Sequence, residues 1–151
     1  MIIQTSRFGD VTITEDQLVT FPRGLVGLPD ATGFALLSVA PESPFYWMQS
    51  LDDKDLAFLV TDPNVFLKDY DVSIREDTQQ DLHLADTKDG RLLVICNRVG
   101  EWLTGNLMGP LVINTVARLG QQMVLTEKTW SHRQPLVKVG IGQQTLRAAA
   151  A

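Results

Sequence analysis

Residues 43–63 read SPFYWMQSLDDKDLAFLVTDP, and this stretch decides the fold. Two runs rich in aromatic and other apolar side chains, residues 45–50 and 56–61, flank a short acidic segment. Such runs favour strands, and a connection of this length suits a hairpin. We therefore predict an antiparallel hairpin in which Ser50 pairs with Leu56.

This register divides the side chains of the hairpin between two faces. One face carries Tyr46, Met48, Leu56, Phe58 and Val60, which we expect to form the core. The other carries Phe45, Trp47, Gln49, Ala57, Leu59 and Thr61, a mixture of aromatic and polar groups that is typical of interfaces. A strand with one exposed face should alternate apolar and polar residues, so the second face needs a cover. Either another element of the chain or a protein partner provides it.

Short strand-like runs separated by Gly, Pro or Asp recur along the rest of the chain. They span residues 2–5, 11–13, 17–21, 34–39, 71–74, 92–97, 111–115 and 122–125. This rhythm predicts an all-β, mainly antiparallel domain that forms a small closed or semi-closed β-barrel. One short surface helix is expected near residues 75–82, because Ser73 and Glu76 have capping-box spacing. We expect residues 1–139 to form the domain and residues 140–151 a flexible tail.

The charge balance points away from nucleic acids and toward a basic protein. The chain has 151 residues, 18 acidic and 13 basic, and a net charge of −5 without a cluster of Lys or Arg. Direct binding to nucleic acid depends on such clusters and is therefore not expected. Asp52, Asp53 and Asp55 crowd the hairpin loop, where they either steer a basic partner or simply form a solvated face.

The residues that carry chemistry elsewhere in proteins form no catalytic or metal-binding pattern here. Cys96 lies inside an apolar run and is expected to be a buried, unreactive thiol. His83 and His132 are far apart and have no cysteine nearby, so neither a metal nor another cofactor is expected. Asp52 and Asp53 are adjacent on a solvated loop, which does not tune a carboxylate for acid/base catalysis. We therefore expect a protein that is not an enzyme.

Other polar and aromatic residues are expected to serve the fold. Trp102 and Trp130 should cap the core, and Asn106 and Asn114 should bridge turns. No apolar run approaches the roughly 20 residues of a membrane-spanning helix, which favours a cytoplasmic protein without a membrane role.

Five segments resemble the FliW family in their order and spacing. They are MIIQTSRFG, FPRGLVGLPD, the hairpin quoted above, TGNLMGPLVINT and GQQMVL, and together they extend over about residues 1–125. The resemblance implies a small barrel-like β fold without enzymatic activity. It further implies a protein that binds CsrA, antagonises the repression of flagellin mRNA by CsrA, and also binds flagellin.

The resemblance and the hairpin pattern lead to one hypothesis about the binding site. Phe45 and Trp47 would be apolar anchors for a partner, and Asp52, Asp53 and Asp55 would be acidic steering groups. The free protein is expected to be a monomer. The alternative function is a β-barrel that binds a small ligand in an internal cavity, although the large inward residues are expected to fill a barrel of this size.

Overall fold

The computed structural model describes residues 1–126 and 129–139, so the predicted tail at residues 140–151 lies outside the described residues. The strands are β1 (Ile2–Thr5), β2 (Gly9–Thr12), β3 (Leu18–Thr20), β4 (Gly33–Ser38), β5 (Phe45–Ser50), β6 (Ala57–Thr61), β7 (Gly90–Val99), β8 (Trp102–Gly105), β9 (Leu111–Asn114), β10 (Leu119–Gln122) and β11 (Gln134–Lys138). The helix α1 (Glu76–Asp81) and short 3-10 helices at Glu15–Gln17, Pro63–Val65 and Thr87–Asp89 complete the fold.

Seven strands close into a barrel. The hydrogen-bonded order runs from β7 through β6, β5, β4, β3, β10 and β9, and β9 pairs again with β7. All of these pairs are antiparallel except β3 with β10, which meet in parallel through Thr20 and Leu119. The predicted all-β barrel with one short helix is therefore confirmed.

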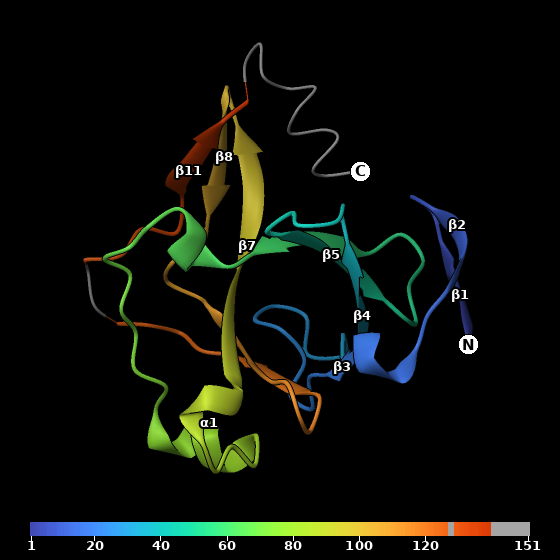
Figure 1. Ribbon diagram of the computed structural model, residues 1–151, viewed down its shortest axis with the longest axis horizontal. Coiled ribbons are helices and arrows are strands. Elements are labelled where there is room, and N and C mark those ends of the chain that lie inside the picture. The colour runs from blue at the N-terminus through green and yellow to red at the C-terminus, as the bar shows by residue number, and fades with distance from the viewer. Residues whose placement is uncertain (127–128, 140–151) are drawn as a thin grey trace.

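The long strand β7 serves both the barrel and an extension of it. Its first part, Gly90–Leu93, pairs with β9, and its last part, Cys96–Val99, pairs with β8. Strand β11 then pairs with the outer edge of β8. We call β8 and β11 together the β8–β11 arm, which extends from the barrel at the top of the view, while the separate β1–β2 hairpin lies at the right (Figure 1).

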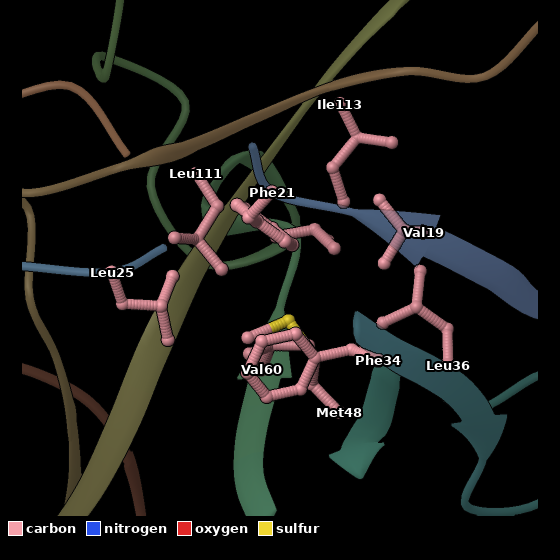
Figure 2. Packing of buried hydrophobic residues seen from close by; sticks show 10 residues of the cluster. Val19, Phe21, Leu25, Phe34, Leu36, Met48, Val60, Leu111 and Ile113 are labelled. Carbon is pink, nitrogen blue, oxygen red and sulfur yellow. The ribbon is translucent and has the colours of Figure 1, made fainter. Parts of the chain in front are cut away.

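Large apolar side chains fill the interior of the barrel. Phe21, Phe34, Met48 and Leu111 have no exposed surface, and they pack against one another and their neighbours (Figure 2). The rings of Phe21 and Phe34 meet edge to face, with their centroids 5.7 Å apart. These side chains occupy the volume in which an internal ligand would lie.

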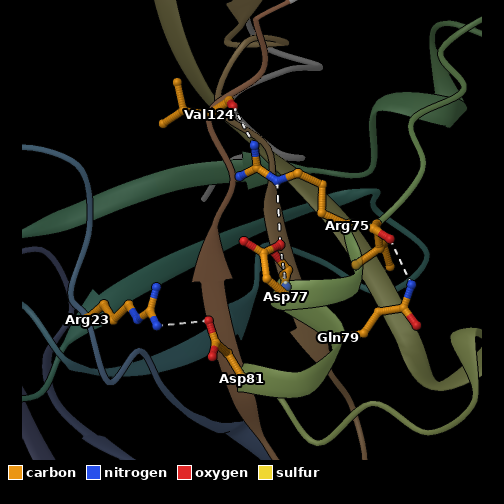
Figure 3. Close-up of polar contacts among 8 residues, drawn as sticks. Arg23, Arg75, Asp77, Gln79, Asp81 and Val124 are labelled. Atoms are coloured by element: carbon orange, nitrogen blue, oxygen red, sulfur yellow. Dashed lines mark hydrogen bonds and ion pairs between the residues drawn. The ribbon is translucent and has the colours of Figure 1, made fainter.

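Helix α1 lies on the surface where it was predicted, but its cap differs from the prediction. Arg75, not Ser73, is the N-cap residue, and no side chain caps the helix. The guanidinium of Arg75 instead donates a hydrogen bond to the carbonyl oxygen of Val124 over 3.3 Å (Figure 3). Asp81 forms an ion pair with Arg23 over 3.0 Å. Contacts with distant segments therefore hold this helix in the position that a local capping box was expected to fix.

The strand predictions were wrong at three places. Residues 71–74 form no strand, β10 begins and ends three residues earlier than the predicted run at 122–125, and the β8–β11 arm was not predicted. The turn before β10 depends on Arg118 at a φ of 58°, which sets the register of the following strand against β9. Strand β11 contains Pro135 and a register shift after it, both of which hide its strand character in the sequence.

Candidate functional site

The hairpin of β5 and β6 has the predicted register. Met48 pairs with Phe58, Gln49 pairs with Ala57, and the Ser50 amide donates a 2.9 Å hydrogen bond to the Leu56 carbonyl oxygen. The face predicted to form the core does so. Met48 and Val60 on this face are completely buried, and Tyr46, Leu56 and Phe58 pack against the same cluster.

The second face of the hairpin is covered by the chain itself. Phe45 is only 3% exposed and packs in a cluster with Leu103 of β8 and with Val139. Its ring also contacts Phe66, at a centroid distance of 5.6 Å. The expectation that Phe45 faces outward as a partner anchor is therefore wrong, because the β8–β11 arm occupies the space in front of it.

Trp47 is half-buried beneath the turn of the β1–β2 hairpin. The guanidinium carbon of Arg7 lies 4.0 Å from the centre of the indole ring, and Phe8 meets the same ring nearly edge on at 6.4 Å. The first contact is a cation–π interaction and the second an edge-to-face aromatic pair, and both are stabilising. Trp47 is thus not a free apolar anchor, and nothing in the local sequence signals that Arg7 and Phe8, about 40 residues earlier, cover it.

The acidic loop between β5 and β6 has a defined backbone conformation. The hydroxyl oxygen of Ser50 accepts hydrogen bonds from the amides of Asp52 (3.2 Å) and Asp53 (3.0 Å). A carboxylate oxygen of Asp53 accepts a 2.9 Å hydrogen bond from the amide of Asp55, a turn typical of Asp. The loop is therefore a folded projection of the hairpin.

The turn of the β1–β2 hairpin joins this loop. The Ser6 amide donates a 2.9 Å hydrogen bond to the carbonyl oxygen of Lys54, and the Ser6 hydroxyl donates to the carboxylate of Asp55. Arg7 follows directly and covers Trp47. The structure thus brings Asp52, Asp53 and Asp55 together with the first hairpin, while Phe45 lies at the other end of β5.

The loop presents its negative charge to solvent. Asp52, Asp53 and Asp55 are all exposed, as is Lys54 between them. The ion pairs of the described residues, Arg23–Asp81, Arg75–Asp77 and Lys138–Glu101, all lie elsewhere. The loop carboxylates are therefore available to attract a positively charged surface.

A second candidate is a cleft of about 330 Å³ at one end of the barrel. Apolar side chains line most of it, with Val26 at 64% and Leu28 at 39% exposure on its rim. The side-chain amide of Gln122 spans it, accepting a hydrogen bond from the Val26 amide (2.9 Å) and donating one to the Gly109 carbonyl (3.0 Å). These bonds use both ends of the Gln122 amide and join two barrel loops.

The other polar and aromatic residues that the sequence singled out mostly stabilise the fold. Asn114 bridges a turn as expected, donating to the Leu82 carbonyl (2.9 Å) and accepting from the Val116 amide (2.9 Å). Trp130 packs against Tyr70 with the ring centroids 4.8 Å apart. Trp102 is 43% exposed at the start of β8, so the expectation that it caps the core is wrong, because the arm turns this position away from the barrel.

Cys96 is the buried thiol that the sequence predicts. It is 5% exposed, and burial raises the pKa of its thiol to about 12. Within residues 1–126 and 129–139, no group of three or more His, Cys, Asp or Glu side chains is arranged to hold a metal ion. Over the same residues, no helix has the length and apolar character needed to cross a membrane.

Fold and site together define a small closed β-barrel that carries a structured, exposed acidic loop. The model of the family described as FliW protein matches residues 2–136. The chain belongs to the FliW family of flagellar assembly factors.

Individual relatives agree with this assignment. The flagellar assembly factor FliW of Natranaerobius thermophilus is 36% identical over 142 residues, which cover 90% of this chain and 92% of the relative. That of Bacillus licheniformis is 35% identical, with 90% of this chain and 96% of the relative covered. A crystal structure of the flagellar assembly factor FliW superposes with a TM-score of 0.82 at 29% identity, covering 93% of this chain and 99% of that one.

Proposed function

We propose that this chain is a cytoplasmic, non-enzymatic binding protein that takes up CsrA and thereby antagonises its repression of flagellin mRNA. Membership of a family of flagellar assembly factors supports a role connected with the flagellum. The observation that carries the proposal is the exposed, hydrogen-bonded acidic loop at Asp52, Asp53 and Asp55 on a chain of net charge −5. Such a loop attracts a basic protein that itself binds RNA.

Flagellin is the second partner in this proposal. Flagellin that accumulates in the cytoplasm occupies the protein and releases CsrA, so the switch works by mass action between two partners. Titration of flagellin into a preformed complex with CsrA tests this step. Release of CsrA as flagellin is added is the expected result, and a complex that stays intact at saturating flagellin would contradict it.

The role of the acidic loop is tested by reversing its charge. The double variant Asp52→Lys/Asp53→Lys should lower the association rate with CsrA about tenfold at low salt, because rim charges act mainly on diffusional encounter. The rate constant is measured by surface plasmon resonance at two salt concentrations, and folding is checked by circular dichroism.

A matched control separates this effect from a general change in charge. Asp69 and Asp71 are exposed carboxylates outside the hairpin, and the double variant Asp69→Lys/Asp71→Lys changes the net charge by the same amount. It should bind CsrA at nearly the wild-type rate. Equal association rates for the two double variants would show that the hairpin loop is not the steering site.

A further inference from the structure

Gln49 is a buried polar side chain whose amide nitrogen is directed at the inside of the acidic loop. It is completely buried, at 0% exposure. Its side-chain nitrogen lies 3.2 Å from the carbonyl oxygens of Ser50, Lys54 and Leu56, and 3.4 Å from that of Asp53. Two N–H groups are therefore shared among four backbone acceptors.

The four acceptors converge on this amide because the loop curls back on itself within a few residues. Three of these carbonyls also accept a backbone amide: that of Leu56 from Ser50, that of Asp53 from Leu56, and that of Lys54 from Ser6. The Gln49 amide lies inside the loop and gives the carbonyls of Asp53 and Lys54 a second donor, which ties the loop to the buried side of β5. The side chains of the same two residues are exposed.

The side-chain oxygen of Gln49 indicates that this residue is present for its amide donor. Among the described residues, its side-chain oxygen is buried and has no hydrogen-bond partner. An unpaired buried acceptor costs about 1–3 kcal/mol, which an apolar side chain at this position would avoid. The Lys54 carbonyl that Gln49 holds also accepts the amide of Ser6, so the same side chain supports the contact with the β1–β2 hairpin.

We infer that Gln49 is a positioning residue that holds the acidic loop and its carboxylates in the conformation to which the basic partner binds. This inference rests on the proposed function. A loop that is already ordered loses little conformational entropy on association, whereas a mobile loop must be ordered at that moment. Loss of the Gln49 amide leaves every charge of the loop in place, so it acts on the lifetime of the complex rather than on encounter.

The test replaces Gln49 with methionine, which has similar length and no hydrogen-bond donor. The matched control is Thr61→Val in the same hairpin, because Thr61 is also completely buried and its hydroxyl donates to the Pro44 carbonyl (2.8 Å) at the end away from the loop. Both variants lose one buried polar group. Gln49→Asn, whose amide is one methylene too short to reach the loop carbonyls, is the second variant should Gln49→Met not fold.

Two readouts are measured on each folded variant. The first needs no partner: hydrogen exchange at the amides of Asp53, Asp55 and Leu56 should become at least tenfold faster in Gln49→Met and stay unchanged in Thr61→Val. The second uses CsrA as the probe. Dissociation should become about tenfold faster in Gln49→Met, with the salt dependence of association retained.

The outcomes distinguish this inference from the proposed function. Unchanged exchange in the loop, or a wild-type dissociation rate in Gln49→Met, overturns the positioning role of Gln49 while Asp52→Lys/Asp53→Lys still slows association. Wild-type binding by the charge-reversed loop overturns the proposed function itself, and with it the role of Gln49 in binding. Faster dissociation of Thr61→Val to the same extent would assign the effect to general destabilisation and also overturn the positioning role.

Discussion

Phe45 and Trp47 lie two positions apart on the same face of β5, yet different parts of the chain cover them. The β8–β11 arm buries Phe45 almost completely. The first hairpin covers Trp47 by placing Arg7 and Phe8 against its indole ring. Gln49, two positions further on, is buried beneath the acidic loop. On this face of β5, each of the three side chains is therefore covered by a different segment of the same chain.

The burial of Phe45 leads to a prediction about stability. Phe45→Ala should lower the free energy of unfolding by about 3–5 kcal/mol, because it removes a ring from a packed cluster and leaves a cavity. Urea denaturation followed by circular dichroism measures the change. Val65→Ala is the control, because Val65 is close in sequence but 58% exposed, and it should change the stability by less than about 0.5 kcal/mol. A Phe45→Ala protein of wild-type stability would contradict the packing described here.

The loop at residues 22–30 shows how single glycines shape an element. Gly24 and Gly27 both have positive φ angles, of 67° and 80°. A Cβ atom at Gly24 would lie 2.4 Å from the carbonyl oxygen of Pro29, whereas one at Gly27 would meet nothing within 4 Å. Leu25 and Leu28 form the isolated bridge that closes this loop beside the cleft. Only Gly24 is therefore required by both its backbone angle and its surroundings.

This difference predicts unequal effects for the same substitution. Gly27→Ala should cost about 1 kcal/mol, the usual cost of a positive φ angle for alanine. Gly24→Ala should cost clearly more, about 2–4 kcal/mol, because rigid backbone must also move. Thermal unfolding of the two variants measures the difference. Equal melting temperatures would show that the contact with Pro29 relaxes without cost.

The elements that could be predicted from the sequence are those specified by local patterns. The register of β5 with β6 follows from two apolar runs and the length of the loop between them, and the structure has it. A cover for the second face from the chain itself was one of the two predicted alternatives. Which element provides it could not be predicted, because this depends on packing between residues far apart, such as Phe45 and Val139. The exposure of Asp52, Asp53 and Asp55 on the loop agrees with the local pattern, and their role in binding stays a prediction. The contacts that Ser6, Arg7 and Gln49 make with this region were not predicted, because they depend on the tertiary fold.

The whole molecule is organised around β7, which joins the barrel to the arm. Cys96 pairs with Leu59 of β6 and with Gly105 of β8, so it lies where barrel and arm meet. Its thiol is enclosed by Phe45, Leu103 and Val139. Solvent therefore reaches this thiol only when the barrel and the β8–β11 arm separate, so the thiol ionises readily only in the unfolded chain.

The raised pKa of Cys96 predicts a loss of stability in alkali. The thiol ionises at a pKa of 9.0 in the unfolded chain, but burial raises its pKa to about 12 in the folded protein. Between these values the folded state binds one proton more than the unfolded state, so the free energy of unfolding falls as the pH rises. The loss should reach about 1.4 kcal/mol at pH 10. Cys96→Ala should lack this component when both proteins are compared by urea denaturation at pH 7 and pH 10, and parallel pH profiles would contradict the prediction.

The parallel contact between β3 and β10 has a consequence for the synthesis of the protein. It joins residues about 100 positions apart, and the guanidinium of Arg118 seals it with a 2.7 Å hydrogen bond to the Leu18 carbonyl. A ribosome adds about 5–20 residues per second, so β3 waits about 5–20 s for its neighbour. Until β10 is made, β3 lacks this neighbour, and an unpaired strand edge is a site at which chains associate. The synthesis of β10 thus allows the barrel to close and removes the unpaired edge of β3.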